Sequence, residues 1–227
     1  MNSEAEEPMA EPIAHDSKAE ESSSGEVTRQ KILDAAESLI IEHGFAATSL
    51  RAIANQADVN LAATHYHFGS KQGLLAAVFH RRMGPVTEAR LKRLEEVELS
   101  GEAITVRKVL TAFFAPFHDA MRSGLIRILP GLVARMYAEP PALTKPIMEG
   151  EFSEVAGRYI AAMHRARPDL SEEELRWRFH FMIGSMIQLL QFHAPLGMPS
   201  NESALQEGLN RLLDFTVAGI EQRGETL

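Results

Sequence analysis

Apolar side chains recur along most of the chain at the spacing of amphipathic helices. The first clear stripe consists of Ile32, Leu33, Ala36, Leu39 and Ile40. These positions share one face of a helix of about four turns. We expect Thr28 to be its N-cap and Gly44 its C-terminal stop. No segment alternates polar and apolar residues, and no Asn-Gly hairpin turn occurs. The pattern therefore predicts an all-α protein.

Two short helices are expected after this first one. Thr48 can cap a helix over residues 49–56, and Asn60 can cap another over residues 61–67. The few residues between them leave room only for a tight turn. A helix, a tight turn and a second helix form the pattern of a helix-turn-helix, in which the second helix enters the major groove of DNA.

Longer helices fill the rest of the chain. Ser70 is the expected cap of the next helix, and Gly84-Pro85 is expected to break it, with Pro85 in the first turn of its successor. Asp169 or Ser171 can cap the penultimate helix. The remaining long helices are expected over residues 104–122, 127–138, 143–167, 172–193 and 202–222.

Charge divides the chain into three blocks. Residues 1–26 hold eight acidic residues and one basic residue, and the composition predicts a disordered acidic leader. Residues 27–94 hold nine basic and five acidic residues, and the rest of the chain is acidic again. A basic block inside an acidic chain is compatible with binding to nucleic acid. We expect a helix-turn-helix domain over 27–83 and a second helical domain over 84–227.

The composition argues against several other classes of protein. Without cysteine there is neither a disulfide framework nor a cysteine zinc site. No stretch of 18 apolar residues and no secretory signal are present, so we expect a soluble, cytoplasmic protein. His65 and His67 lie two positions apart on a helix and point in different directions, which disfavours a metal site.

Nothing in the sequence predicts an enzyme or a cofactor. An enzyme would need a nucleophile or an acid–base pair, a phosphate loop or a metal set, and no such motif occurs. The nearest candidates are His118-Asp119 and His164, and each is better explained as a surface or core residue. An enzyme and a helical protein-binding scaffold are kept as alternative functions.

Five spaced motifs over about residues 27–82 resemble the TetR family of bacterial transcriptional regulators: Leu33–Phe45, Thr48–Ala54, Val59, Tyr66–Lys71 and Leu74-Leu75. The resemblance implies a helical homodimer with three DNA-binding helices and a larger ligand-binding and dimerisation domain. The sequence departs from the family pattern in and after the turn. Asp58 stands where glycine is usual, Ala62-Ala63 replaces Gly-Thr, Thr64 replaces leucine, and His65 replaces tyrosine.

The resemblance and the helix pattern together predict the DNA-binding residues. Lys71 is expected to contact a phosphate, and Tyr66 is expected to contact phosphate and sugar or else to pack on the first helix. Arg51 can bind a guanine or a phosphate. Thr48 and Ser49 can act as caps with or without a phosphate contact. The full set is Thr48, Ser49, Arg51, Asn60, Leu61, Ala62, Ala63, His65, Tyr66, His67 and Lys71, with Ile53, Ala54, Val59 and Phe68 as the internal wedge.

The second domain is rich in Met and Phe, which suggests an apolar ligand pocket, although an ordinary core explains the same residues. The pocket prediction comprises Phe113, Phe117, Met121, Met136, Phe152, Trp177, Phe181 and Met182, within a buried interior that also includes Phe114, Met163, Met186 and Phe192. Arg135, Arg176 and Arg178 can pair with a ligand carboxylate or with local acids. The segment Arg176–Gly184 is similar to the branch of the family typified by PsrA, which implies a fatty acid or acyl-CoA effector.

These observations predict a ligand-responsive repressor. It would bind an inverted-repeat operator as a homodimer and be released by a small hydrophobic effector. The last two helices are expected to form the dimer seam. Their small residues would let backbones approach closely: Gly184, Ser185, Ala204, Gly208 and Ala218.

Overall fold

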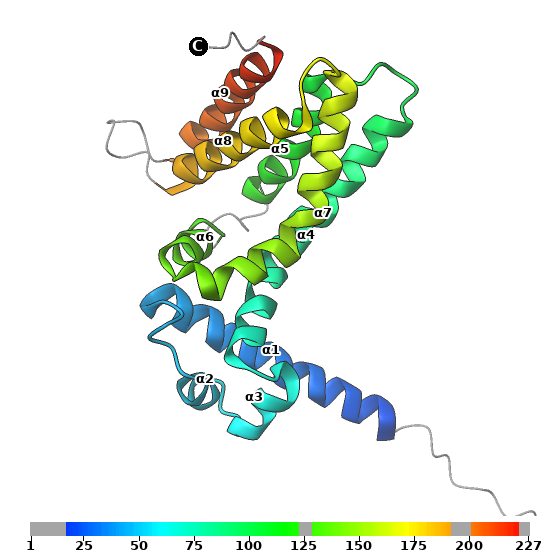
Figure 1. Cartoon of the computed structure of the whole chain (residues 1–227). Helices are drawn as coiled ribbons and strands as arrows, with labels where there is room; N and C mark the ends of the chain where they lie inside the picture. Colours follow the sequence, from blue (N-terminus) through cyan, green and yellow to red (C-terminus); the bar gives the residue numbers. More distant parts are fainter. Residues whose placement is uncertain (1–16, 123–128, 192–200, 223–227) are drawn as a thin grey trace, which may run out of the picture.

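In a computed structural model of the chain, residues 17–122, 129–191 and 201–222 are described, and every regular element among them is a helix. The helices are α1 (Ser17–His43), α2 (Leu50–Gln56), α3 (Leu61–Phe68), α4 (Lys71–Leu99), α5 (Val106–Arg122), α6 (Leu129–Ala138), α7 (Pro141–Ala166), α8 (Glu172–Gln191) and α9 (Glu202–Glu221). The all-α prediction is confirmed. Helices α1–α3 form one end of the molecule, and α4 runs from them into a larger unit of α5–α9 (Figure 1).

The first helix begins earlier than the sequence pattern predicts. It starts at Ser17, so residues 17–26 of the predicted disordered leader are helical, and the Thr28 hydroxyl donates to the Ser24 carbonyl 3.0 Å away instead of capping the helix. No proline interrupts this segment, and the helix simply continues upstream of its apolar stripe. Residues 1–16 of the predicted leader lie outside the described residues. The predicted stop is confirmed, because Gly44 has a φ of +84°.

The cap of α2 is Ser49, not the predicted Thr48. The Ser49 hydroxyl accepts a hydrogen bond of 3.1 Å from the backbone N–H of Ala52. Thr48 is only 3% exposed, and its hydroxyl donates to the Gly44 carbonyl at 2.8 Å. Thr48 therefore holds the loop after α1 through a buried hydrogen bond, and Ser49 satisfies one free N–H group at the start of α2.

Three other predicted caps are confirmed. The Asn60 side chain accepts from the N–H of Ala62 at 2.9 Å at the start of α3, and Ser70 caps α4 in the same way. Ser171 is the cap of α8, because its hydroxyl accepts from the N–H of Glu174.

Helix α4 passes through Gly84-Pro85 without the predicted break. Proline lacks one backbone donor and crowds the preceding turn, which normally ends or bends a helix. Here Met83 and Val86, on either side, are both buried in the core, so tertiary packing holds the helix together across the proline. The expected domain boundary at residues 83 and 84 therefore falls inside a helix that both units share. The other long helices lie within three residues of their predicted bounds.

An ion-pair cluster joins α1 to α4. Arg81 pairs with Asp34 and Glu37 at 2.6 and 2.7 Å, and Arg82 pairs with Glu37 at 2.6 Å. Burial by itself would raise the pKa of the Glu37 carboxyl, but hydrogen bonds from Arg82 and Arg81 outweigh it and leave this pKa below its ordinary value. The cluster fixes the angle between the small unit and the long helix.

Aromatic rings fill the centre of the larger unit. Phe113 of α5 makes edge-to-face contacts with Phe114, with Tyr159 of α7 and with Phe179 of α8, at centroid distances of 5.0–6.0 Å. The Tyr159 hydroxyl donates to the backbone carbonyl of Arg90 at 2.8 Å, which ties α7 to α4. Across the described part of the chain, no helix is both long and apolar enough to span a membrane.

Candidate DNA-binding surface and ligand cavity

The turn between α2 and α3 depends on one residue in the left-handed region. Asp58 has a φ of +52°, the only positive φ of a non-glycine residue in the described part of the chain. Aspartate tolerates this conformation better than most residues do, and it occupies the position where the resemblance leads one to expect glycine. Ile53 and Ala54 are buried beneath the turn, whereas Val59 and Phe68 of the predicted wedge are half-buried.

Most of the predicted DNA-binding residues are exposed or half-buried at the surface on and next to α2 and α3. The Tyr66 side chain is 86% exposed. Exposed with it are Ser49, Arg51, Asn60, Leu61, Ala62 and His65, while Ala63, His67 and Lys71 are half-buried. Thr48 alone of the predicted set is buried, so it does not belong to this surface. We call the other ten residues the α3 surface.

Lys71 folds back against the loop between α1 and α2. Its Nζ donates to the Ala46 carbonyl at 3.2 Å and lies 4.4 Å from the centre of the Phe45 ring. Burial lowers the pKa of the Lys71 ammonium, and the charge of Glu139 acts in the opposite direction. The phosphate contact expected of Lys71 would therefore compete with these contacts.

Inside α3, the Thr64 side chain is buried, and its hydroxyl has no hydrogen-bond partner among the described residues. His65 points its Nδ1 to the Gly69 carbonyl at 3.2 Å, which closes the end of the helix. Among the described residues, no three or more histidine or acidic side chains gather in a way that could hold a metal ion.

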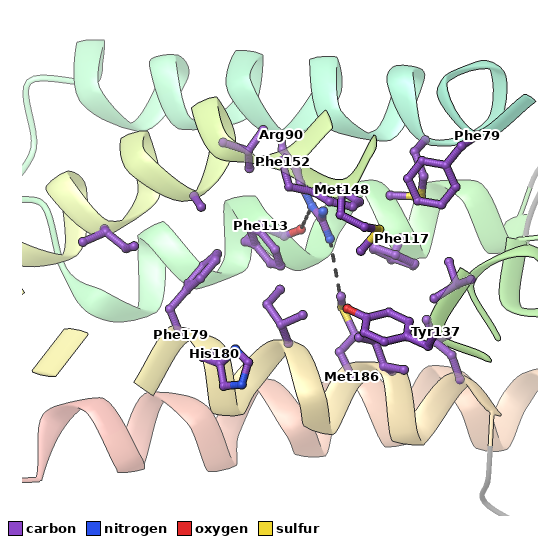
Figure 2. A pocket seen from close by; sticks show the side chains of 18 of the residues that line it. Phe79, Arg90, Phe113, Phe117, Tyr137, Met148, Phe152, Phe179, His180 and Met186 are labelled. Atoms are coloured by element: carbon purple, nitrogen blue, oxygen red, sulfur yellow. Dashed lines mark hydrogen bonds between the residues drawn. The ribbon is translucent and has the colours of Figure 1, made fainter. Parts of the chain in front are cut away.

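The larger unit contains an apolar cavity of about 370 Å³. Its wall comes from α4, α5, α6, α7 and α8 (Figure 2). The lining residues are Phe79, Met83, Arg90, Phe113, Phe117, Val133, Tyr137, Met148, Phe152, Val155, Ala156, Ile160, Arg176, Phe179, His180, Ile183, Met186, Ile187 and Leu190. This volume lies at the lower end of the range for small-molecule sites, about 300–1,000 Å³.

Some of the residues predicted for the ligand pocket line this cavity and others do not. Phe113, Phe117 and Phe152 line the cavity. Trp177 and Phe181 do not: they are 54% and 61% exposed, on the outer face of α8. Met136 and Met182 are buried in the core without lining the cavity. The side chain of Met121 and the whole of Phe192 lie outside the described residues.

Sequence reasoning missed the contribution of α4. Phe79, Met83 and Arg90 lie on one face of this helix, at spacings of four and seven residues, and all three line the cavity. This spacing indicates a shared helix face only if the helix is continuous. Because a break was expected at Gly84-Pro85, the three residues were not recognised as one face. The inner face of α8 was missed for a different reason. Phe179 and Ile183 face inward there, but apolar residues also cover the opposite face.

Arg90 is the unusual member of the cavity wall. It is 1% exposed, its Nε donates to the Phe113 carbonyl at 3.1 Å, and its Nη2 lies 4.0 Å from the sulfur of Met186. The guanidinium carbon stands 3.7 Å from the centre of the Phe113 ring and 4.9 Å from that of Phe117. Burial lowers the pKa of Arg90 to about 9, which still leaves the group cationic at neutral pH.

A carboxylate connects the larger unit to the small unit of α1–α3. Glu139, at the corner between α6 and α7, accepts hydrogen bonds from the backbone N–H groups of Phe45 at 2.6 Å and Ala46 at 3.1 Å. Tyr137, two residues earlier, lines the cavity. The corner therefore touches the cavity on one side and the loop before α2 on the other. We call this contact the Glu139 contact.

The other charged candidates have structural partners. Arg178 pairs with Glu174 at 2.7 Å and donates to carbonyls at the end of α9, and Arg176 pairs with Glu172 at 3.3 Å. The side chain of Arg135 lies outside the described residues.

The nearest candidates for catalytic residues also have partners. Asp119 pairs with Arg93, and the His164 ring lies 3.0 Å from the Leu170 carbonyl. The structure thus gives both groups ordinary surface or packing contacts.

Comparisons with known proteins match both units. A family model described as "Bacterial regulatory proteins, tetR family" matches residues 32–78, and one described as "Tetracyclin repressor-like, C-terminal domain" matches residues 111–219. The HTH-type transcriptional regulator BetI of Rhizobium meliloti (strain 1021) is 24% identical over 164 residues, which cover 63% of this chain and 81% of the relative.

Two solved structures show the same fold. SmeT, the repressor of the Stenotrophomonas maltophilia multidrug efflux pump SmeDEF, matches with a TM-score of 0.60 and 22% identity over 85% of this chain and 91% of its own. The fatty acid degradation regulator FadR from Bacillus halodurans matches with a TM-score of 0.61 and 16% identity over 86% and 97%. At these identities the likeness concerns the fold.

Proposed function

Because the chain belongs to the TetR family of bacterial transcriptional regulators, we propose that it is a repressor whose homodimer binds an inverted-repeat operator and is released by a small hydrophobic effector. One observation carries this proposal. Helix α4 forms part of both units: its first residues adjoin α3, and residues farther along it line the cavity. A change in the cavity can therefore reorient the α3 surface.

The α3 surface supplies the proposed contacts with DNA. Tyr66, almost fully exposed, can reach the sugar–phosphate backbone, and Ala62 can approach a thymine methyl group. Arg51 is exposed on α2 and has the donors for guanine or phosphate. For Lys71 to bind a phosphate, its ammonium must leave the Ala46 carbonyl.

We propose that a second copy covers the outer face of α8 and α9. Trp177 and Phe181 of α8 are exposed side by side, with ring centroids 5.9 Å apart, and Phe215 of α9 is 73% exposed. Large exposed apolar groups gathered on one face are typical of an interface. Of the small residues in this region, Gly208 allows close approach within the chain, since a Cβ there would meet Leu189 at 2.8 Å.

Two routes can carry a change from the cavity to the DNA-binding unit. The first is α4 itself, which is fixed to α1 by the ion pairs that Arg81 and Arg82 form with Glu37. The second is the Glu139 contact, since α6 lines the cavity and the corner after it holds the loop before α2. An effector shifts the equilibrium only by its preference for one arrangement, and a preference of about 3 kcal/mol changes occupancy roughly a hundredfold.

The nature of the effector follows from the cavity wall, which is mostly aliphatic and aromatic. This supports a hydrophobic ligand. The similarity of Arg176–Gly184 in α8 to the PsrA-like branch of the family suggests a fatty acid or its acyl-CoA ester as the effector. A structure of SmeT in complex with triclosan shows that a protein of this fold holds an apolar small molecule.

The test starts from genomic fragments that the full chain retains at low salt. Binding to one selected fragment is then measured by fluorescence anisotropy across salt concentrations. Arg51→Ala should lose about 1–3 kcal/mol of discrimination at one base pair, and Lys71→Ala should weaken binding to all sequences and flatten the salt slope by about one unit.

Lys108→Ala serves as the control, because Lys108 lies on α5 and pairs with Glu102. It should leave both quantities unchanged. Failure of the wild-type chain to retain any double-stranded fragment would refute the proposal and favour a protein-binding scaffold.

A further inference from the structure

Arg90 is a buried cation without an acidic partner among the described residues. Its contacts are a backbone carbonyl, a methionine sulfur and two phenyl rings. An arginine side chain has five N–H donors, and these contacts occupy only some of them. Burying an uncompensated charge is costly, and aromatic faces offset only part of that cost.

The rest of the cavity wall offers no acidic partner to Arg90. Arg176 and His180 line the cavity as well, Arg176 pairs with Glu172 at 3.3 Å, and none of the lining residues is acidic. Figure 2 shows the Arg90 side chain extending from α4 into the cavity, toward Met186 on the opposite wall. An occupant therefore meets the Arg90 cation among apolar groups, with no carboxylate among the described lining residues.

We propose that this cavity selects an effector with an apolar body and a carboxylate, and that Arg90 binds the carboxylate through its free N–H groups. The planar guanidinium matches a carboxylate in a two-point contact, which is among the stronger hydrogen-bonded pairs in proteins. The phenyl rings and Met186 would then pack on the apolar body. The inference rests on the proposed function only in taking this cavity as the effector site.

This chemistry separates the two candidates for the effector. A free acid carries its charge at the end of the chain, beside which Arg90 would lie. An acyl thioester has a neutral carbonyl at that point, and its charges belong to a headgroup far larger than a cavity of about 370 Å³. The free acid is therefore the form that satisfies Arg90.

The experiment compares two ligands of equal chain length, sodium decanoate and 1-decanol, by isothermal titration calorimetry on the full chain. The wild-type protein should bind decanoate about tenfold or more tightly than decanol. Arg90→Met should remove this preference, and Arg90→Lys should keep part of it. Arg93→Met, on the same helix but paired with Asp119 outside the cavity, should keep all of it.

A melting curve separates binding from folding. Arg90→Met should melt no lower than the wild-type protein, because it removes a buried lone charge. A lower melting temperature, together with an unchanged preference for decanoate in Arg90→Lys and Arg90→Met, would make Arg90 a structural residue and overturn the inference. The wild-type comparison needs no variant: equal binding of decanol and decanoate also overturns it, and leaves the hydrophobic effector standing.

Release from DNA is measured separately, with the selected fragment. If decanoate binds through Arg90 and the fragment stays bound, release by the effector fails as a proposed function and the inference on ligand class stands. If neither ligand binds, the inference is overturned.

Discussion

The DNA-binding unit and the ligand-binding unit differ in whether their buried charged side chains have a partner of opposite charge. Where α1 meets α4, the buried carboxylate of Glu37 receives hydrogen bonds from Arg81 and Arg82. Farther along the same helix, the buried guanidinium of Arg90 receives no carboxylate from the described residues. A compensated charge fixes one geometry, whereas an uncompensated one leaves part of its interactions to a ligand. Glu37 accordingly has a structural role, and the role that we propose for Arg90 is to bind a ligand.

The largest effect is expected from breaking the compensated cluster. Glu37→Gln should lower the free energy of unfolding by about 2 kcal/mol at pH 7, because it removes charged acceptors from two arginines. The pKa of Glu37 is lowered in the folded state, so its contribution is present above the ordinary value of 4.5 and is lost as the pH falls through the folded value. Urea unfolding at a series of pH values measures both predictions.

Glu207→Gln is the matched control, since Glu207 pairs with Arg211 on the exposed face of α9. Exposed pairs contribute about 0.3–0.5 kcal/mol. If Glu37→Gln costs no more than this control, or if the difference from wild type does not shrink as the pH falls below 4.5, the joint between the units does not depend on this carboxylate.

A smaller effect is expected at the Glu139 contact, which links the two units. Glu139→Ala should reduce the coupling between effector and operator by about 1 kcal/mol, because two N–H groups of the α1–α2 loop lose their acceptor. The measurement is the ratio of operator affinities with and without decanoate. Glu149→Ala, on the exposed part of α7, should leave the ratio unchanged. An unchanged ratio in Glu139→Ala would leave α4 as the only route.

The smallest effect is expected in the turn of the DNA-binding unit. Asp58→Gly should raise the free energy of unfolding by about 0.5 kcal/mol, because glycine adopts a positive φ without strain but loses more entropy on folding. Asp58→Ala should lower it. Chemical denaturation of the two variants measures both changes in the free energy of unfolding. A loss of stability in the glycine variant would mean that the Asp58 side chain supports the turn.

The units also differ in how far the sequence reveals them. In the DNA-binding unit, Asn60 and Ser70 could be recognised as caps because a cap depends on a few neighbouring residues. Both Thr48 and Ser49 could be recognised as possible caps, but two adjacent residues offer the same hydroxyl and only the loop geometry decides that Ser49 caps α2. In the ligand-binding unit, aromatic residues on opposite faces of α8 looked alike, and packing alone shows that Phe179 faces inward and Trp177 outward.

By itself, the sequence determined the helical class and most helix limits. These features depend on the periodicity of apolar residues and on short-range hydrogen bonds, and both are set by residues that are close together in sequence. Only the tertiary structure decided that α4 continues through Pro85 and that Arg90 meets Phe113 and Met186 without an acid. Both outcomes depend on contacts between helices that are distant in sequence. At Pro85 the packing of α4 compensates for the missing backbone hydrogen bond, and at Arg90 the packing excludes water from the guanidinium.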